Sequence, residues 1–233
     1  MKSIIITGAS SGIGHATAKV FLEAGWRVGV IARRADRLEA LADQYETAIP
    51  LPADVTDATG MQAAFDAFGH IDVLFNNAGL FGPAATIDEI DLEEWAQVLQ
   101  VNVGGMFIAA RLAFAKMRAQ DPQGGRIINN GSLSAYVPRP NSVCYTTTKH
   151  AVTGLTKTLS LDGRPFGIAC GQIDIGNAET ALLAQLKKSQ PGTDTMDVSN
   201  AARSVLHMAE MPAEANVQFM TVMATRMPYI GRG

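Results

Sequence analysis

The chain has 233 residues, of which 47% are hydrophobic and 18% charged, a composition typical of a globular protein. Its formal net charge of -3 lacks the basic excess that nucleic-acid-binding proteins carry. Two cysteines, Cys144 and Cys170, are too few for a disulfide framework or a metal cluster and indicate a reducing compartment. No uninterrupted apolar run approaches the roughly 18–20 residues of a membrane span. We therefore expect a cytoplasmic protein without a metal site, a nucleic-acid partner or a membrane segment.

Short apolar segments alternate with segments of helical periodicity along the chain. In chain order we predict strand Ser3–Thr7, helix Gly12–Ala24, strand Arg27–Ala32, helix Asp36–Gln44, strand Ala48–Pro52, helix Ala58–Phe68, strand Ile71–Asn76, helix Leu92–Ala119, strand Arg126–Asn130, helix Val143–Leu161, strand Gly167–Ile173, helix Ser199–Ala209 and strand Val217–Ala224.

Strands that alternate with helices imply crossover connections and a parallel sheet covered by helices on both faces. The apolar runs "IIIT", "VGVIA" and "VLF" suit strands that are buried on both faces. No linker or repeat divides the chain, so we predict one α/β domain over residues 1–233. Its fold class is a doubly wound, Rossmann-like domain with a sheet of about seven parallel strands. Ligands of such sheets bind beyond the carboxyl ends of the strands, where we expect the functional residues.

The first strand is followed by "TGASSGIG", in which Gly8, Gly12 and Gly14 stand between a strand and a helix. Glycines there allow a tight turn and a close approach of the backbone to a pyrophosphate at the helix N-terminus. The alternative is an ordinary glycine-rich turn. We expect cofactor contacts from six residues of this loop, Gly8, Ser10, Ser11, Gly12, Ile13 and Gly14.

The second strand is followed by Ala32, Arg33 and Arg34, with no acidic residue before Asp36. A nucleotide site of this type reads the adenosine ribose here, and an arginine accommodates the 2′-phosphate of NADP where an acidic residue would select NAD. The arginines therefore favour NADP(H) over NAD(H). The alternative is a pair of solvated charges at a helix start.

The third strand is followed by "ADVTD". Asp54, at the end of this strand, could accept a hydrogen bond from the adenine amino group, and Val55 adjoins it. Asp57 is expected to cap the next helix.

The segment "VCYTTTKHA" holds Tyr145 and Lys149 four residues apart, on one face of a predicted helix. Taken alone, this pair indicates little, because such pairs occur by chance on many soluble helices.

The chain resembles the short-chain dehydrogenase/reductase family in five motifs that stand in the family's order and spacing. These motifs are "TGASSGIG", "NNAG" at Asn76–Gly79, "QVNVGG" with Asn102, "INNGSLSA" with Ser132, and "YTTTK" with Tyr145 and Lys149. The resemblance covers about Ser3 to Ala224. It implies a catalytic tetrad of Asn102, Ser132, Tyr145 and Lys149. It also implies an adenine contact from Asp54, an NADP-selecting role for Arg33, and a wall of the cofactor cleft formed by Asn76, Ala78 and Gly79.

Reduction of a carbonyl group needs a hydride on carbon and a proton on oxygen, and the cofactor supplies only the hydride. In the implied mechanism Tyr145 is the general acid, and the charge of Lys149 lowers the pKa of its phenol. Lys149 also bonds the nicotinamide ribose, and Ser132 holds the substrate oxygen. Asn102 binds a water that relays protons to Lys149. The alternative is that these four are ordinary structural side chains.

The sequence departs from the family after the sixth strand, in "IDIGNAET". Ile175 replaces the family's proline, whereas Gly176 and Thr180 keep the family pattern, and Ala178 stands where a backbone group meets the nicotinamide carboxamide. Without the fixed φ of proline this loop is less restrained. We still expect cofactor contacts from Gly176, Ala178 and Thr180.

The resemblance implies an NADP-dependent oxidoreductase that acts on a small alcohol or carbonyl substrate, with a lid at about residues 177–198. A binding-only protein, such as a redox sensor or a scaffold subunit, is the alternative. The methionine-rich tail after Val222 packs either on its own core or against another subunit. Long helices of this kind are the usual subunit contacts in the family, so we expect a homodimer or homotetramer.

Overall fold

The computed structural model describes residues 1–180 and 194–230. Seven parallel strands form one sheet in the order β3-β2-β1-β4-β5-β6-β7. The order reverses beside β1, where the chain leaves one half of the sheet for the other, as in a doubly wound fold. The predicted fold class is therefore confirmed. The strands are β1 Ser3–Thr7, β2 Arg27–Ala32, β3 Ala48–Pro52, β4 Val73–Asn76, β5 Gly125–Asn130, β6 Ile168–Gly176 and β7 Phe219–Met223.

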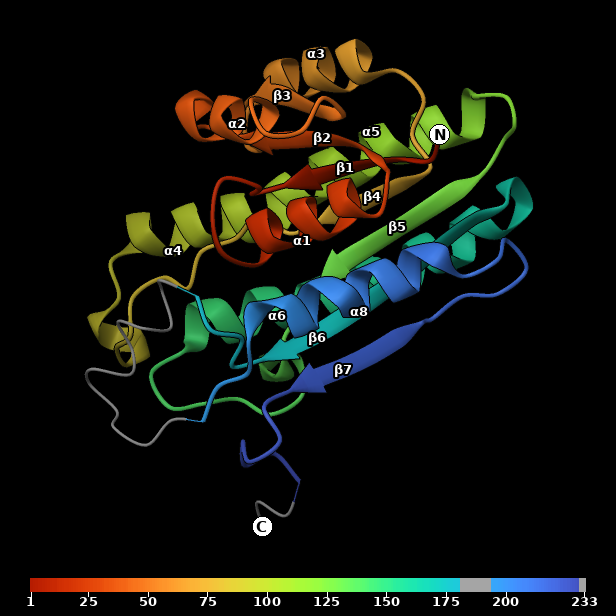
Figure 1. The fold of residues 1–233 in the computed structure, drawn as a ribbon. Coiled ribbons are helices and arrows are strands. Elements are labelled where there is room, and N and C mark those ends of the chain that lie inside the picture. Colours follow the sequence, from red (N-terminus) through yellow and green to blue (C-terminus); the bar gives the residue numbers. More distant parts are fainter. Residues whose placement is uncertain (181–193, 231–233) are drawn as a thin grey trace.

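Helices cover both faces of this sheet (Figure 1). Helices α1, α2 and α8 contribute to the apolar cluster on one face, and α3 and α5 contribute to the cluster on the other. The helices are α1 Gly12–Glu23, α2 Ala35–Ala42, α3 Ala58–Phe68, α4 Leu92–Leu99, α5 Met106–Ala119, α6 Val143–Gly163 and α8 Val198–Glu210, with short turns η1 Ile87–Glu89, η2 Gln100–Gly105, η3 Leu133–Ala135 and η4 Arg164–Phe166.

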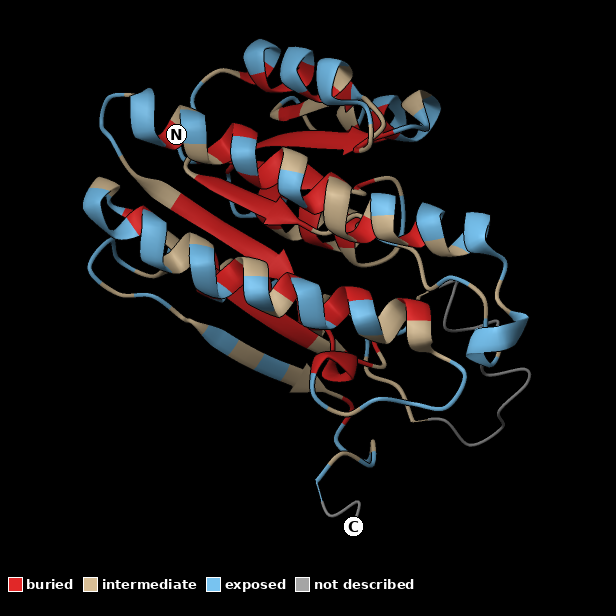
Figure 2. Cartoon of the chain, turned by 180° about the vertical axis from the view of Figure 1, so that it is seen from behind, coloured by how far each residue is buried: buried red, intermediate tan, exposed pale blue. Residues whose placement is uncertain are grey.

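The central strands are buried on both faces, as Figure 2 shows by their colour. Along β1, Ile4 and Ile6 pack into the cluster beneath α1 and α8, whereas Ile5 between them packs into the opposite cluster. Successive side chains of a strand point to opposite faces, so a continuous run of isoleucines supplies both cores at once.

The predicted helix Leu92–Ala119 is not one regular α-helix. Its middle, Gln100–Gly105, is a π-helical segment between α4 and α5. At Gly105 the backbone approaches Val55 so closely that a Cβ atom would lie 2.7 Å from the valine Cγ2. A π-helical turn inserts one residue into the helical repeat and often marks a functional site, and this one contains Asn102.

The combined helical stretch Leu92–Ala119 is long enough to be considered as a membrane span, and an 18-residue window within it has a mean hydropathy of 1.5. In the fold it packs beside the sheet, where Ala109, Leu112, Ala113 and Met117 belong to the buried core. The packing accounts for its apolar character without a membrane.

Strand β6 extends to Gly176, three residues beyond its predicted end at Ile173. Its last residues pair with β7, in the register Ile175 with Val222 and Gly176 with Met223. A proline at position 175 would lack the N–H group that a strand pairing uses. The isoleucine that departs from the family pattern therefore suits a longer strand.

The chain beyond β7 turns back over the sheet end. The Ala224 N–H donates to the Gly176 carbonyl at 3.3 Å, and the Met227 N–H donates to the Ala224 carbonyl at 2.9 Å. These bonds fix only the start of the tail, since Thr225, Arg226, Pro228 and Ile230 are exposed, and both alternatives for the methionine-rich tail stay open.

Candidate active site

A cleft of about 550 Å³ lies where the strands end, bounded by the loops after β1 to β6, by α6 and by the tail. Seventeen of the predicted site residues line it: Gly8, Ser10, Ser11, Gly12, Ile13, Arg33, Arg34, Asp54, Val55, Ala78, Gly79, Ser132, Tyr145, Lys149, Gly176, Ala178 and Thr180. Three predicted residues, Gly14, Asn76 and Asn102, do not line it.

The loop after β1 lines the cleft with glycine residues, whose backbone has no side chain to cover it. Gly8 and Gly12 adopt φ angles of 68° and 56°, which side chains other than glycine rarely take. Gly14 stands behind the loop, where a Cβ atom would lie 2.4 Å from the Gly8 carbonyl oxygen. Helix α1 begins at Gly12, and Ser11 at its N-cap makes no side-chain capping bond. Unpaired N–H groups and the helix dipole therefore face the cleft, a setting that suits a pyrophosphate group.

The two arginines after β2 lie at one end of the cleft. The Arg34 Nη2 donates to the Ser10 Oγ at 2.9 Å, which ties β2 to the glycine loop. The Arg33 Nη1 lies 3.9 Å from the Asp54 Oδ2, and the Arg33 side chain is largely exposed whereas that of Asp54 is partly buried. The Asp54 carboxylate accepts from the Thr56 N–H at 2.9 Å, and this bond holds its pKa below the usual value. Asp54 thus presents an ionised acceptor to the cleft.

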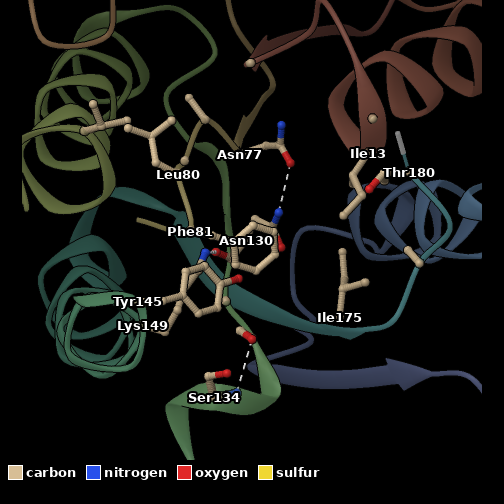
Figure 3. A pocket seen from close by; sticks show the side chains of 18 of the residues that line it. Ile13, Asn77, Leu80, Phe81, Asn130, Ser134, Tyr145, Lys149, Ile175 and Thr180 are labelled. Atoms are coloured by element: carbon tan, nitrogen blue, oxygen red, sulfur yellow. Dashed lines mark hydrogen bonds between the residues drawn. The ribbon is translucent and has the colours of Figure 1, made fainter. Parts of the chain in front are cut away.

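Asn76 points away from the cleft, contrary to the prediction that it forms a cofactor wall. It is buried, and its Nδ2 donates to the Met106 carbonyl at 2.8 Å. Asn77 lines the cleft instead, and its Oδ1 accepts from the Asn130 Nδ2 at 2.9 Å (Figure 3). Asn76 and Asn77 are adjacent at the end of β4, so their side chains point to opposite sides of the chain. Period-2 alternation from the buried β4 strand was the signal available for choosing between them.

Tyr145 and Lys149 project from α6 into the cleft, as expected for residues four apart on one helical face (Figure 3). The ring of Tyr145 packs against Phe81, with centroids 4.6 Å apart. The Lys149 Nζ donates to the Asn130 carbonyl at 2.6 Å and lies 5.4 Å from the centroid of the Tyr145 ring. On the loop after β5, the Ser132 Oγ accepts from the Ser134 N–H at 3.1 Å.

Burial controls the charge state of both side chains. It raises the pKa of Tyr145, although the Ser132 hydroxyl and the Arg139 charge act in the opposite direction. It lowers the pKa of Lys149 to about 8. Lys149, which we expected to lower the pKa of the phenol, is not among the described groups that shift it, and burial has the largest effect. The Tyr145 phenol is consequently held in its protonated form, ready to donate.

Asn102 lies behind the cleft rather than in it. Its Oδ1 accepts from the Leu80 N–H at 2.7 Å, and its Nδ2 donates to the Leu80 carbonyl at 2.8 Å and to the Thr148 Oγ1 at 3.1 Å. These bonds fix the loop after β4, whose residues Leu80 and Phe81 line the cleft. Asn102 therefore holds the loop that carries Leu80 and Phe81 in place.

The opposite end of the cleft is lined by two further segments of the chain. Side chains after Ser132 and from the tail meet there, namely Leu133, Val137, Arg139, Met227, Pro228 and Tyr229. These residues follow irregular backbone, and no periodicity in the sequence would have placed them together. Among the described lining residues, Asp54 is the only acid, and it lies at the other end.

The predicted lid falls mostly on residues 181–193, outside the described residues. The chain segments on either side of them are joined by a parallel bridge between Ala178 and Met196, with the Glu179 N–H donating to the Met196 carbonyl at 2.8 Å.

Comparisons with known proteins agree with this architecture. The sequence model of the family described as short chain dehydrogenase matches residues 2–191. The chain is 37% identical over 198 residues to 2-(R)-hydroxypropyl-CoM dehydrogenase of Xanthobacter autotrophicus, covering 80% of this chain and 78% of that protein. It is 29% identical to sulfoacetaldehyde reductase 2 of Chromohalobacter salexigens, over 97% of this chain and 95% of that protein.

A solved structure of 3-ketoacyl-(acyl-carrier-protein) reductase from Brucella melitensis, complexed with NADH, superposes with a TM-score of 0.88 at 27% identity. The alignment covers 97% of this chain and 98% of that chain. Three observations agree with one another. A protein of the same fold binds NADH, the glycine loop of this chain precedes a helix N-terminus without a side-chain cap, and the family model matches most of the chain. The chain belongs to the short-chain dehydrogenase family, as an oxidoreductase that binds a nicotinamide dinucleotide.

Proposed function

We propose that the protein is an NADP-dependent oxidoreductase that transfers a hydride between NADPH and a carbonyl or alcohol substrate, with Tyr145 as general acid and base. One observation carries this proposal. Tyr145, Lys149 and Ser132 converge on a cleft that also contains the phosphate-type cradle of Gly8 and Gly12.

When bound, the cofactor supplies the hydride, and the side chains supply the proton and the geometry. In reduction the Tyr145 hydroxyl donates its proton to the carbonyl oxygen, and in oxidation the phenolate accepts it back. The Ser132 hydroxyl donates to the same oxygen as negative charge develops there. The Lys149 ammonium stabilises the phenolate and would also hold the ribose of the cofactor. Asn102 is a positioning residue in this scheme, because its bonds hold Leu80 rather than any reacting atom.

The preference for NADP rests on Arg33 and Arg34, which line the cleft at the end of β2 with no acidic residue beside them on that loop. A guanidinium group can bond a 2′-phosphate through two parallel N–H donors, whereas the 2′-hydroxyl of NAD calls for a carboxylate. We expect Arg33→Ala to reduce the NADPH/NADH ratio of kcat/KM about tenfold or more. The matched control is Arg37→Ala, an exposed arginine that does not line the cleft. An unchanged ratio in Arg33→Ala would remove Arg33 from this role.

The charges of the cleft favour a substrate with an anionic group. Arg139 lines the substrate end together with Tyr145, and no acid among the described residues lines that end. The relative named sulfoacetaldehyde reductase acts on an aldehyde that carries a sulfonate. The test compares an oxo acid with its methyl ester. Arg139→Gln should reduce kcat/KM for the acid and spare the ester, whereas an equal loss for both would contradict an anion contact.

A binding-only protein, such as a redox sensor or scaffold subunit, is the rival function. A screen of ketones, aldehydes and sugars for NADPH oxidation separates the two. Turnover of any of them supports the oxidoreductase, and tight NADPH binding without turnover across the screen would favour the rival. We further propose a cytoplasmic homodimer or homotetramer, in keeping with two buried, unpaired cysteines and exposed apolar side chains on α5 and α6.

A further inference from the structure

A buried acidic residue lies directly behind the loop that carries Ser132. Asp174, on β6, is 1% exposed and does not line the cleft. A carboxylate so deeply buried is rare unless it has partners that stabilise its charge.

The Asp174 Oδ1 has two hydrogen-bond donors. It accepts from the Ser132 N–H at 2.8 Å and from the Gln172 Nε2 at 2.8 Å, and Gln172 is held in turn by Thr153 on α6 at 3.1 Å. A Cβ atom on Gly131 would lie 2.1 Å from this same oxygen, so only glycine permits the contact. The backbone at Gly131 and Ser132 is thus packed against the Asp174 carboxylate and hydrogen-bonded to it.

The Asp174 Oδ2 is buried and has no hydrogen-bond partner among the described residues. Three titratable groups interact with this carboxyl group, namely Lys149 and Tyr145 on α6 and Tyr136 after η3. Two further groups act on these neighbours, because Arg139 interacts with Tyr145 and Tyr229 interacts with Tyr136.

The electrostatic influences on these groups oppose one another. Burial raises the pKa of Asp174, whereas its hydrogen bonds, Tyr136 and the charge of Lys149 lower it. In return the Asp174 charge raises the pKa of Lys149 and of Tyr145. A charged Asp174 therefore favours the ammonium form of the lysine and the neutral form of the phenol.

We propose that Asp174 is a positioning residue of the active site, whose carboxylate anchors the Ser132 backbone and provides the buried negative charge that balances Lys149. The proposal rests on the proposed function, because its main readout is the pH dependence of turnover. It assigns Asp174 no contact with substrate or cofactor.

The test is the pH profile of kcat/KM for NADP-linked alcohol oxidation in Asp174→Asn. Asparagine can keep an oxygen acceptor for the Ser132 N–H but carries no charge. Since a negative charge raises the pKa of both Tyr145 and Lys149, its removal should move both limbs of the profile to lower pH, by about one unit. The matched control is Asp43→Asn, an exposed acid at the end of α2, which should leave the profile in place.

If kcat/KM falls in Asp174→Asn but both limbs of the pH profile stay at their wild-type pH, the electrostatic part of the proposal is overturned. Asp174→Ala, which lacks the acceptor as well, should lose a further factor of about five to ten in kcat relative to Asp174→Asn. Equal kcat values in the two variants would overturn the anchoring part.

Tyr136→Phe provides the same test if Asp174→Asn does not fold. The Tyr136 hydroxyl lowers the pKa of Asp174, so its loss favours the neutral carboxyl group and should move the profile in the same direction, by less. An unmoved profile would overturn the charge role. Failure of the proposed function is distinguishable, because the wild-type protein would then show no turnover at any pH.

Discussion

Lys149 carries its ammonium group inside the protein, only 3% exposed, and this placement lowers the stability of the fold. Burial lowers its pKa from 10.5 to about 8, so the folded state binds a proton less readily than the unfolded chain. Between these two values the unfolded state binds more protons, and stability therefore rises with pH across that range. At pH 7 this pKa shift lowers the free energy of unfolding by about 3 kcal/mol relative to a lysine whose pKa is the same in the folded and unfolded states. A residue that costs this much is retained for its chemistry rather than for packing.

The free energy of unfolding of the wild type should accordingly rise by about 3 kcal/mol relative to that of Lys149→Met as the pH rises from 8 to 10.5, because only the wild type has a lysine that loses its proton over this range. Urea denaturation of both proteins at several pH values measures the difference. The control is Lys157→Met, an exposed lysine of the same helix, for which the difference should not vary with pH. A difference in the free energy of unfolding between the wild type and Lys149→Met that stays constant with pH would contradict a buried ammonium.

At the scale of single elements, the π-helical segment Gln100–Gly105 shows what the sequence could and could not predict. Apolar periodicity predicted one helix over Leu92–Ala119 and correctly covered its ends, because α4 and α5 each keep their apolar spacing. The one extra residue of a π-helical turn changes the apolar spacing too little to be recognised from the sequence. The π-helical backbone is seen in the structure, where Asn102 of this segment bonds Leu80, a residue of a segment distant in the sequence.

Strand ends were predicted less well than strand centres. The centre of β6 is an apolar run, but its extension to Gly176 depends on pairing with β7, which local sequence does not encode. The glycine loop, Arg33, Ser132, Tyr145 and Lys149 all line the cleft. The first two were predicted because they follow a strand, whereas the other three were predicted from the family resemblance. Asp174 was not, because a buried acid in a strand carries no motif.

Asn102→Ala should destabilise the protein by about 2–3 kcal/mol, since it leaves the Leu80 N–H and carbonyl without their partners. It should also raise the KM for NADPH, because Leu80 and Phe81 line the cleft. Urea denaturation and initial-rate kinetics measure the two effects. Gln100→Ala, an exposed position of the same segment, should change stability by less than about 0.5 kcal/mol. Equal stabilities of the two variants would contradict the anchoring role.

At the scale of the whole molecule, apolar side chains remain exposed on the helices of one face. Phe107 on α5 is 55% exposed, and Leu161 on α6 is 56% exposed. Large apolar groups on neighbouring helices are typical of a subunit contact. This is the feature of the described fold that supports the predicted homo-oligomer.

We expect light scattering coupled to size exclusion to give a dimer or tetramer for the wild type, and a smaller assembly for Phe107→Arg. Ala40→Arg, on the exposed side of α2, should keep the wild-type mass. A monomeric wild type, or an unchanged assembly in Phe107→Arg, would contradict a contact through α5.

The proposed hydride transfer requires the Tyr145 phenol as the group that moves the proton. The most direct measurement compares Tyr145→Phe with the wild type in NADPH-dependent reduction of the best carbonyl substrate, together with the Kd for NADPH. We predict that turnover falls by a factor of about 10²–10⁴ while the Kd stays within about twofold, because phenylalanine keeps the contact with Phe81 and lacks only the acid. Turnover near the wild-type value in Tyr145→Phe, with the Kd likewise unchanged, would contradict the mechanism.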